Sequence, residues 1–491
     1  MKNLDRPACV DEERLLREVR DPRTSASFSF LQFAVLNRGV PVVVGAFLGI
    51  YALGSFAADG ASSAQNTLVT SSAQIATTSL PSEMDKFNQF DALGEPGTTT
   101  YQYFPSFDTL GHDKGGWRSD LAKHDISVQD TFFISMATPL RSTGQPRDPQ
   151  LYNGQRFTVM EAAFQITPTF GLASWGLPNS KIVTSVMGLT SSFERGNSPN
   201  TVAFQSLYYY QSFADKAVEL KVGWNTNYYD YVGMFLGGSP FLSGGVSGLV
   251  PLQVGMSASP TPAPMVNLTF NAKNDTYLKL GVQRSSSPHG QHYEQERDGF
   301  HGLNWKQDDA GPLYLAEAGI NRPAAPGEHR QWLRAGYMYN NSDYTKFSGD
   351  GTSANRGVYA AGDYQLTQPS QDMSFRGVYV GATAYKAPED VNAYTNSYEA
   401  RLYWIGPVES RPTDTVSFKY NYNKFSSDLG RASEAQGAFF NSDQTQYALS
   451  YSAHAFRGVY MIPSVIYTKH PSIIGDFNNS VVAALTIAVG F

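Results

Sequence analysis

Ionisable side chains recur at alternate positions in several short segments of the chain. Glu219 and Lys221 are separated by one residue in "AVELKVGWN", and Glu399 and Arg401 are separated by one residue in "SYEARLYW". Because successive side chains of a β-strand point to opposite faces, each segment puts its charges on one face and its apolar residues on the other. The charged face is suited to hydrogen bonding with a polar solute in a water-filled space.

The expected inward-facing charges include both signs in similar number. They are Glu161, Glu219, Lys221, Lys279, Glu317, Arg334, Asp363, Glu399, Arg401 and Lys419. A phosphate-selective pore would show an excess of Lys and Arg, and a strong cation filter would show a ring of Asp and Glu. Mixed charges interleaved with Tyr and Trp favour a neutral polyol, because polar groups bond its hydroxyls and aromatic faces cover its C–H groups. The alternative is that these charges pair with one another across the wall and only stiffen it.

Other residue types that carry chemistry do not form a recognisable site. His289, His292 and Glu294 have ligand-like spacing, but they lie in a predicted loop with no helix to align them. Ser452 and His454 share one strand face, as in a hydrolase dyad, yet no acidic residue nearby completes it. We therefore predict no catalytic residues, no metal and no cofactor. The net charge of −6 and the lack of a basic patch argue against a nucleic-acid partner.

The elements that must position the inward charges are membrane-spanning β-strands. Aromatic residues make up 13% of the chain and charged residues only 16%, against about 25% charged in ordinary soluble domains. Alternating segments recur 16 or 17 times between Ile126 and Phe491, and single-chain bacterial barrels usually have an even number of strands. We predict an all-β fold, a closed antiparallel barrel of 16 strands with 18 as the alternative. A large aromatic-rich sandwich or propeller is the competing fold.

The last segment, "SVVAALTIAVGF", indicates how the barrel closes. Val481, Leu485 and Phe491 belong to an apolar, mostly large row, and the residues between them are small. We expect the large row to face lipid and the small row to face the lumen, with this strand pairing against the first so that no edge remains.

The amino-terminal quarter of the chain divides into segments of different character. Residues 1–57 are predicted to be a cleaved signal peptide whose apolar run of about 14 residues falls short of the roughly 20 that a spanning helix needs. An extended signal, a later translation start or an uncleaved anchor are the alternatives. The sequence then predicts a flexible segment over 58–111, a short constricting helix over 112–125 and the barrel over 126–491.

The longer polar connections are expected to share one end of the barrel and to face the cell exterior. They are residues 227–249, 285–311, 341–355 and 424–442. The segment 251–257 is the one doubtful strand.

Several motifs, in order, give the chain a family resemblance. They include "GGWRSDLAKHDISVQ", "ELKVGW", "GPLYLAEAGI", "LRAGYMY", "GVYAAGDYQL", "YWIGPVESRPTDTVSFKYNY" and "MIPSVIYTKHP". Over residues 112–491 the sequence resembles the carbohydrate-selective porins of the OprB type. The resemblance implies a 16-stranded outer-membrane channel that passes glucose-like monosaccharides by diffusion, either as a monomer or as a trimer. It also implies that Phe491 is the signal read by the barrel-assembly machinery.

The resemblance adds candidate lumen residues and also shows departures. It carries over Glu317, Arg334, Asp363, Glu399 and Arg411, where Arg411 is also placed to cap a turn in "SRPTD". The full set of substrate-binding candidates is Glu219, Lys221, Glu317, Arg334, Asp363, Glu399, Arg401 and Arg411. The departures are Ser464 and Ile466, where the family usually has Asp and Gln, and His124–Asp125 in place of a Gly-containing turn. They bear on substrate choice and leave the fold unaffected.

Three functions remain open from the sequence. The first is passive uptake of small sugars across the bacterial outer membrane, with outer-membrane lipid and the assembly machinery as the other partners. The second is a general, organic-acid or polyol diffusion porin. The third is a barrel that serves as an enzyme or as a structural anchor, its lumen plugged by residues 58–125.

Overall fold

The computed structural model describes residues 76–96, 104–141, 159–192, 200–232, 249–290, 293–294 and 302–491. These residues all belong to one compact unit of the chain. The predicted signal peptide, residues 1–57, lies outside the described residues.

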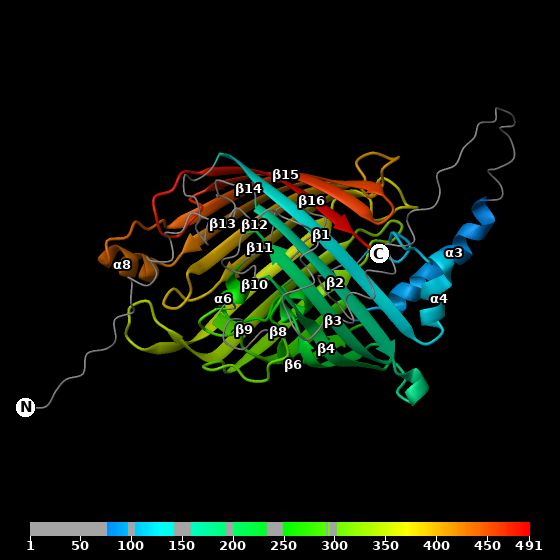
Figure 1. Cartoon of the computed structure of the whole chain (residues 1–491), viewed down its shortest axis with the longest axis horizontal. Coiled ribbons are helices and arrows are strands. Elements are labelled where there is room, and N and C mark those ends of the chain that lie inside the picture. The colour runs from blue at the N-terminus through cyan, green and yellow to red at the C-terminus, as the bar shows by residue number, and fades with distance from the viewer. Residues whose placement is uncertain are drawn as a thin grey trace, which may run out of the picture. The chain divides into compact units, whose positions relative to one another are not determined.

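The described residues form a closed barrel in which every strand pairs antiparallel with its neighbours in sequence, and β1 pairs with β16 (Figure 1). The strands are β1 (Ile126–Arg141), β2 (Val159–Gly171), β3 (Ser180–Ser191), β4 (Thr201–Phe213), β5 (Val218–Asn225), β6 (Ala263–Asn271), β7 (Thr276–Arg284), β8 (Pro312–Arg322), β9 (Gln331–Thr345), β10 (Thr352–Gln365), β11 (Gly377–Lys386), β12 (Tyr394–Ile405), β13 (Thr415–Phe425), β14 (Asp443–Phe456), β15 (Val459–Lys469) and β16 (Ser480–Val489). The predicted count of 16 strands is confirmed, and the doubtful segment 251–257 contributes no strand.

The alternation of residue types explains the two faces of the wall. On β9, Leu333 and Tyr337 are 41% and 46% exposed, whereas Trp332 and Met338 are 4% and 0% exposed. The exposed set is apolar and faces outward, where lipid is the solvent. Register is strongly fixed, because a slip by one residue would exchange the two faces.

Closure between the first and last strands follows the predicted pattern. Ser135 lies opposite Thr486 and their hydroxyls hydrogen-bond inside the barrel. The small inward residues of the terminal strand make room for Phe104, which packs against Ala488. A Cβ atom on Gly490 would lie 2.4 Å from the Phe104 ring, so this position accepts only glycine without rearrangement.

The prediction that residues 58–111 are flexible is wrong for part of this range, because α3 spans Ala76–Leu93. Phe87 and Phe90 are buried on one face of that helix and their rings meet edge to face at 5.6 Å. The Ser/Ala/Thr-rich sequence that leads into the helix concealed it, since few apolar residues of the helix mark a buried face.

The predicted short helix over 112–125 corresponds to the 3-10 turn η2 (Lys114–Gly116) and α4 (Trp117–Ala122). The Asp113 carboxylate accepts hydrogen bonds from the backbone N–H groups of Arg118 and Ser119 at 2.8 and 3.1 Å, which satisfies donors that a helix start leaves free. Although burial raises the pKa of Asp113, its bonds from Lys86 and Ser119 outweigh that effect and lower it to about 2.

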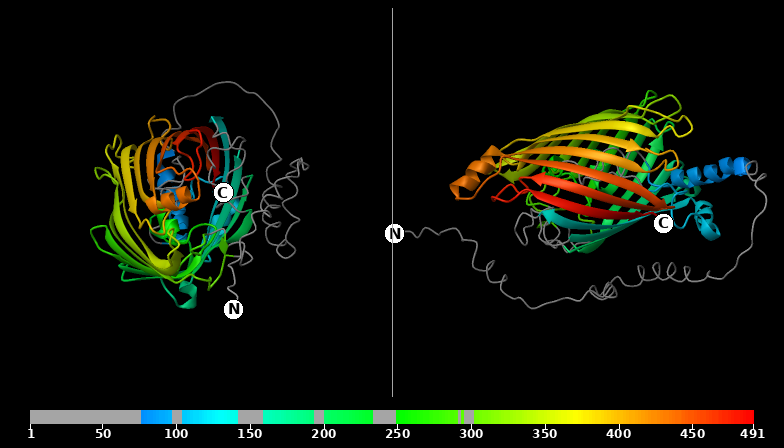
Figure 2. Two further views of the ribbon diagram at one scale, coloured as in Figure 1. Left: turned by 90° about the vertical axis from the view of Figure 1, so that its left-hand side faces the viewer. Right: turned by 90° about the horizontal axis from the view of Figure 1, so that it is seen from above.

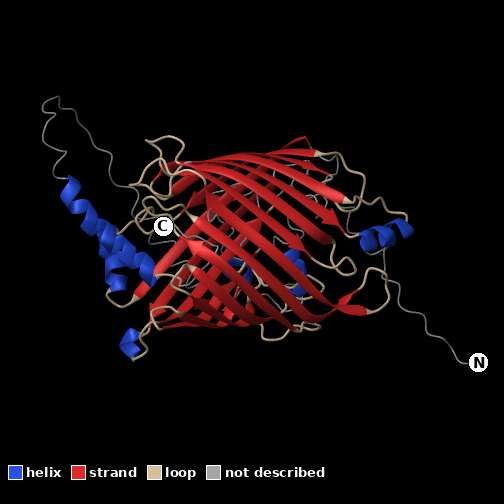
Figure 3. Ribbon diagram, turned by 180° about the vertical axis from the view of Figure 1, so that it is seen from behind, coloured by secondary structure: helices blue, strands red, loops and turns tan. Residues whose placement is uncertain are grey.

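The two ends of the barrel differ. The helices α3 and α4 and the C-terminal residue lie at one end, and α8 (Ser427–Ala435) lies at the other (Figures 2 and 3). The connections predicted to be long all follow odd-numbered strands and share the α8 end, but 341–355 is not a long loop. β9 runs to Thr345 and β10 begins at Thr352, so this connection is a short hairpin turn.

No helix among the described residues is long and apolar enough to cross a membrane.

Candidate functional site

The connection between β5 and β6 folds into the barrel and covers part of its inner wall. It contains α5 (Asn227–Asp230) and α6 (Val250–Gln253), and Figure 1 shows α6 within the outline of the strands. Its residues form one buried cluster with inward side chains of β8 to β11: Tyr228, Tyr231, Val232, Val250, Val254, Met256 and Ala258 pack against Leu313, Leu315, Met338, Tyr359 and Tyr385. We call residues 226–232 and 249–262 the inserted segment.

Cationic side chains predicted to face the lumen form a salt bridge and hydrogen bonds with the inserted segment. Lys221 Nζ lies 2.7 Å from Asp230 Oδ1 of α5, and both groups are buried. Lys279 Nζ donates to the Asp230 carbonyl oxygen. Arg334 Nη2 donates to the Val232 carbonyl oxygen at 2.8 Å. These cations compensate a buried carboxylate and bond carbonyl oxygens at and just beyond the C-terminal end of a short helix.

Glu317 connects these cations across the wall. Its carboxylate accepts hydrogen bonds from Tyr277 and Tyr359 hydroxyls at 2.9 and 2.6 Å, and it lies 3.7 Å from Lys279 Nζ and 3.9 Å from Arg334 Nε. Glu317 and Arg334 are therefore brought together, as the shared inward face predicted.

Glu219 lies apart from this group. It accepts hydrogen bonds from Tyr210 at 2.5 Å and from Asn271 at 2.7 Å.

A second buried network joins β10, β12 and β13. Arg401 lies 2.6 Å from Glu399 and 3.1 Å from Asp363, and Lys419 lies 3.5 Å from Glu399. The Tyr403 hydroxyl donates to Asp363 at 3.1 Å. Three predicted residues thus meet in one site, together with Lys419 from the same inward set.

Arg411 stands outside both networks. It pairs with Asp414 in the connection between β12 and β13, at the α4 end, and donates to the His454 carbonyl oxygen at 3.1 Å. This geometry is that of a turn cap. The other seven candidates are buried and pair with protein groups, which is the arrangement of the wall-stiffening alternative, and their contact with a solute stays a prediction.

The part of the lumen wall that the inserted segment does not cover is formed by β14, β15, β16, β1 and β2. Its partly exposed inward side chains are Gln129, Phe133, Ser135, Glu161, Ala163, Gln444, Gln446, Ser464, Ile466, Ala484 and Thr486. We call this set the open wall. Its hydroxyl and amide groups are suited to hydrogen bonding with a neutral solute, and Glu161 is its single charged member.

Sequence reasoning started from charges and so missed most of the open wall. One signal did point to it: Ser464 and Ile466, the two departures from the family pattern, are inward-facing members of this set.

The N-terminal segment contacts the barrel at the α4 end in two places. On one side, Glu95 accepts from the Tyr208 hydroxyl at 3.0 Å and its backbone N–H donates to Gln129 at 2.7 Å. On the other side, Asp108 accepts from the Gly458 N–H and the Tyr460 hydroxyl, both at 2.8 Å. These contacts come from residues before α4, whereas α4 itself packs on β1. The constricting role given to residues 112–125 stays a prediction.

The Asp108 carboxylate also lies close to the predicted hydrolase-like pair, Ser452 and His454. His454 Nε2 lies 3.0 Å from Asp108 Oδ1, so an acid does approach the histidine from a distant part of the chain. The Ser452 hydroxyl, however, is buried and makes no hydrogen bond with any described group. The serine and the histidine do not form a nucleophile–base pair. No group of three or more His, Cys, Asp or Glu side chains among the described residues is arranged to hold a metal ion.

A sixteen-stranded barrel with an inserted segment and a polar open wall defines the class of protein: an outer-membrane diffusion porin. A sequence profile of the carbohydrate-selective porins, the OprB family, matches residues 167–491. The chain belongs to this family, which confirms the resemblance seen in its motifs. The family and the fold are those of a channel in the outer membrane of Gram-negative bacteria.

Solved structures agree on the fold. The high-pH structure of Pseudomonas putida OprB superposes with a TM-score of 0.67 at 15% sequence identity, covering 81% of this chain and 100% of that chain. The low-pH structure of the same protein gives a TM-score of 0.52 at 13% identity, covering 80% and 100%. A search of curated proteins finds no match.

Proposed function

We propose that this porin passes small neutral sugars, of the size of glucose, by passive diffusion along the open wall. The observation that carries the proposal is the division of the lumen: the described charges are buried and paired on the covered side, while the open wall is nearly uncharged. A charged solute on this path would lose hydration without gaining a counter-ion, whereas sugar hydroxyls would exchange water for Gln, Ser and Thr groups. The barrel then acts as a channel, with no catalytic role.

Ser464 and Ile466 are proposed to set the preference among solutes. Both face the lumen on β15, opposite Ala484 and Val482 of β16. Where a typical family member has Asp and Gln, this chain offers a hydroxyl and an apolar side chain. We infer weaker hydrogen bonding at this point of the path and a greater tolerance for less polar sugars.

Liposome swelling with refolded residues 58–491 tests the proposal, comparing glucose, a disaccharide, glycerol and a sugar acid of glucose size. The expected result is faster swelling with glucose than with the sugar acid. Equal rates ordered only by size would leave a general porin, and no swelling would favour the anchor or enzyme alternatives.

A pair of matched variants locates the path. Ser464→Lys adds a cation to the open wall and is expected to raise the rate of the sugar acid relative to glucose. Ser348→Lys makes the same change in the exposed hairpin turn between β9 and β10 and is expected to leave the ratio unchanged. If both variants behave like the parent chain, the solute does not travel along the open wall. Both must show the heat-modifiable migration of a folded barrel.

Export and assembly are part of the same proposal. Residues 1–57 act as a cleaved signal peptide, and Phe491 serves as the signal that the barrel-assembly machinery reads. The chain works as a monomer or a trimer in the outer-membrane lipid.

A further inference from the structure

Three exposed cations lie on the outward face of the barrel near its α8 end. They are Arg356 on β10, Lys386 on β11 and Lys469 on β15. None of the three forms a salt bridge with any of the described residues. An outward-facing cation on a membrane barrel lies close to the lipid, where it is less well hydrated than in water. Without an acidic partner in the chain, it is stabilised by an anionic group outside the chain.

These three cations lie at the border of the lipid-facing surface, next to its outward apolar and aromatic side chains. Val358, 44% exposed, lies opposite Lys386 in the register of β10 and β11. Tyr467 precedes Lys469 on the same face of β15, and its ring lies 6.2 Å from that of Tyr447 on β14. Tyrosines of this kind mark the interface between hydrocarbon and water in outer-membrane barrels. A step of two residues along a strand, as from Tyr467 to Lys469, covers roughly 7 Å. The cations therefore lie beyond the tyrosines, at the level of the lipid headgroups.

Three of the acidic side chains near these cations bond other groups of the chain. Glu389 lies 3.6 Å from Lys424, which is why Lys424 is left out of the set. Asp443 lies 3.1 Å from His470 Nδ1. Asp343 accepts a hydrogen bond from the Thr352 hydroxyl at 3.2 Å. None of these three carboxylates forms a salt bridge with Arg356, Lys386 or Lys469.

We propose that Arg356, Lys386 and Lys469 bind the phosphate groups of phosphorylated lipid headgroups in the leaflet around the α8 end. The longer connections of outer-membrane barrels face the exterior, so this is the outer leaflet. Lys and Arg stems lie along apolar surface while their charged ends reach the headgroups. Guanidinium and ammonium groups form charge-assisted hydrogen bonds with phosphate oxygens.

The expected size of the effect follows from the number of cations. One Lys or Arg close to an anionic membrane surface changes affinity by about fivefold, so three together change it by on the order of a hundredfold. Screening by salt should weaken the attraction, since the groups are exposed.

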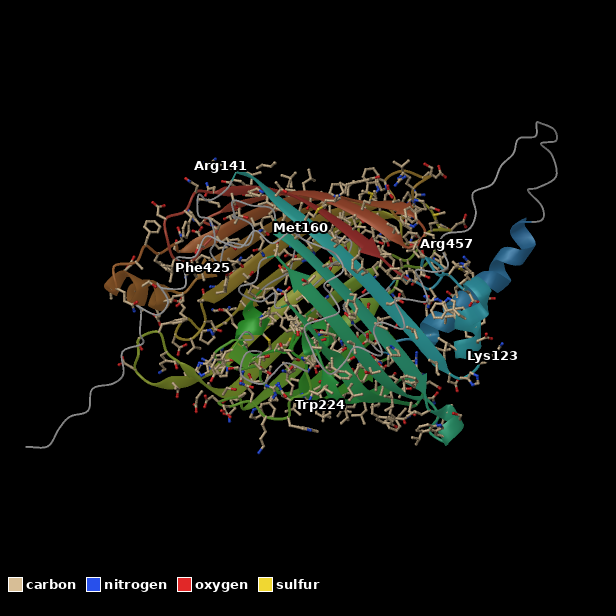
Figure 4. The ribbon with its side chains drawn as sticks, in the orientation of Figure 1. Lys123, Arg141, Met160, Trp224, Phe425 and Arg457 are labelled. Carbon is tan, nitrogen blue, oxygen red and sulfur yellow. The ribbon has the colours of Figure 1, made fainter. Side chains whose placement is uncertain are left out.

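Titration of the refolded chain with lipid A in neutral detergent, with bound lipid followed by native mass spectrometry, tests the proposal. The variant R356Q/K386Q/K469Q is expected to bind lipid A on the order of a hundredfold more weakly. The matched control K216Q/K273Q/R457Q removes three exposed cations from turns at the α4 end, where Figure 4 places Arg457, and is expected to bind like the parent chain. The single change Lys386→Gln, with a loss of about fivefold, keeps the test valid if the triple variant folds poorly.

Two further arms identify the ligand. Dephosphorylated lipid A is expected to lose the cation-dependent binding, and inorganic phosphate is expected not to displace bound lipid A. The proposal is overturned if the triple variant binds as tightly as the parent chain, if the dephosphorylated lipid binds equally well, or if free phosphate displaces the lipid. Glucose swelling of the triple variant should match that of the parent chain, because its substitutions lie outside the lumen.

Discussion

Arg118 donates a hydrogen bond to the backbone carbonyl of Phe491, a residue 373 positions further along the chain. The guanidinium is buried and also bonds the carbonyl oxygens of His112 and Val128 at 2.8 and 3.1 Å. The Phe491 N–H in turn donates to Asp130 of β1 at 2.8 Å. The segment before β1 and the end of the chain are thus fastened to the same point of the barrel seam.

Replacing this guanidinium should loosen the seam. Arg118→Met leaves several backbone acceptors without their donor, and we expect a loss of about 3 kcal/mol in the free energy of unfolding. Arg118→Lys reaches fewer of these acceptors, so its free energy of unfolding should lie between those of the parent chain and Arg118→Met. Urea unfolding in detergent, followed by heat-modifiable migration, measures both, and Arg457→Met at an exposed position serves as the control. Equal stability of all variants would show that the seam does not depend on this contact.

Asp230 should hold the inserted segment in the lumen. Asp230→Asn keeps the shape of the side chain but leaves the buried Lys221 without its partner at 2.7 Å, a change that costs about 3–5 kcal/mol when a buried pair is broken. We expect the segment to leave the wall and disaccharide swelling to speed up relative to glucose.

The double variant Asp230→Asn/Lys221→Met removes both charges and should recover much of the parent behaviour. If Asp230→Asn shows the same ratio of disaccharide to glucose swelling as the parent chain, other contacts of the inserted segment suffice to hold it.

The barrel could be predicted from the sequence because lipid permits no charge on the outward face. That constraint fixes the alternation of strands such as β9 and β12 and, with it, the inward position of Glu317, Arg334, Glu399 and Arg401. What Lys221 and Arg334 bond could not be predicted, since their partners Asp230 and Val232 lie in a connection without periodicity.

The open wall escaped prediction for a related reason. Residues such as Gln446, Ser464 and Thr486 carry no charge and look like ordinary polar strand positions. They matter only because the inserted segment covers the opposite side of the lumen, and that contact is long-range in the sequence.

Gly381 on β11 should be essential to the second charge network. A Cβ atom there would lie 2.4 Å from Asp363 Oδ1 and 2.7 Å from the Arg401 guanidinium. We expect Gly381→Ala to push the pair apart and to lower the free energy of unfolding by about 2 kcal/mol. Gly111→Ala, whose new methyl group would meet its nearest neighbour at an ordinary 3.6 Å, is the matched control. The midpoint temperatures of thermal unfolding of the two variants are compared. Equal midpoints would mean that the network accommodates the methyl group without loss of stability.

The docking of α4 should depend on acid pH through Asp113. Its pKa is lowered to about 2 in the folded chain, so the stabilisation is fully present above the ordinary value of about 3.8 and is lost as the pH falls towards 2. After allowance for solvent screening the effect is about 1 kcal/mol. Hydrogen exchange over Lys114–Ala122 should therefore accelerate between about pH 4 and pH 2 beyond its intrinsic pH dependence. In Asp113→Asn this segment should exchange fast already at neutral pH and show no further loss of protection in acid. A parent chain whose protection stays constant across that range would mean that the helix start is held by other groups.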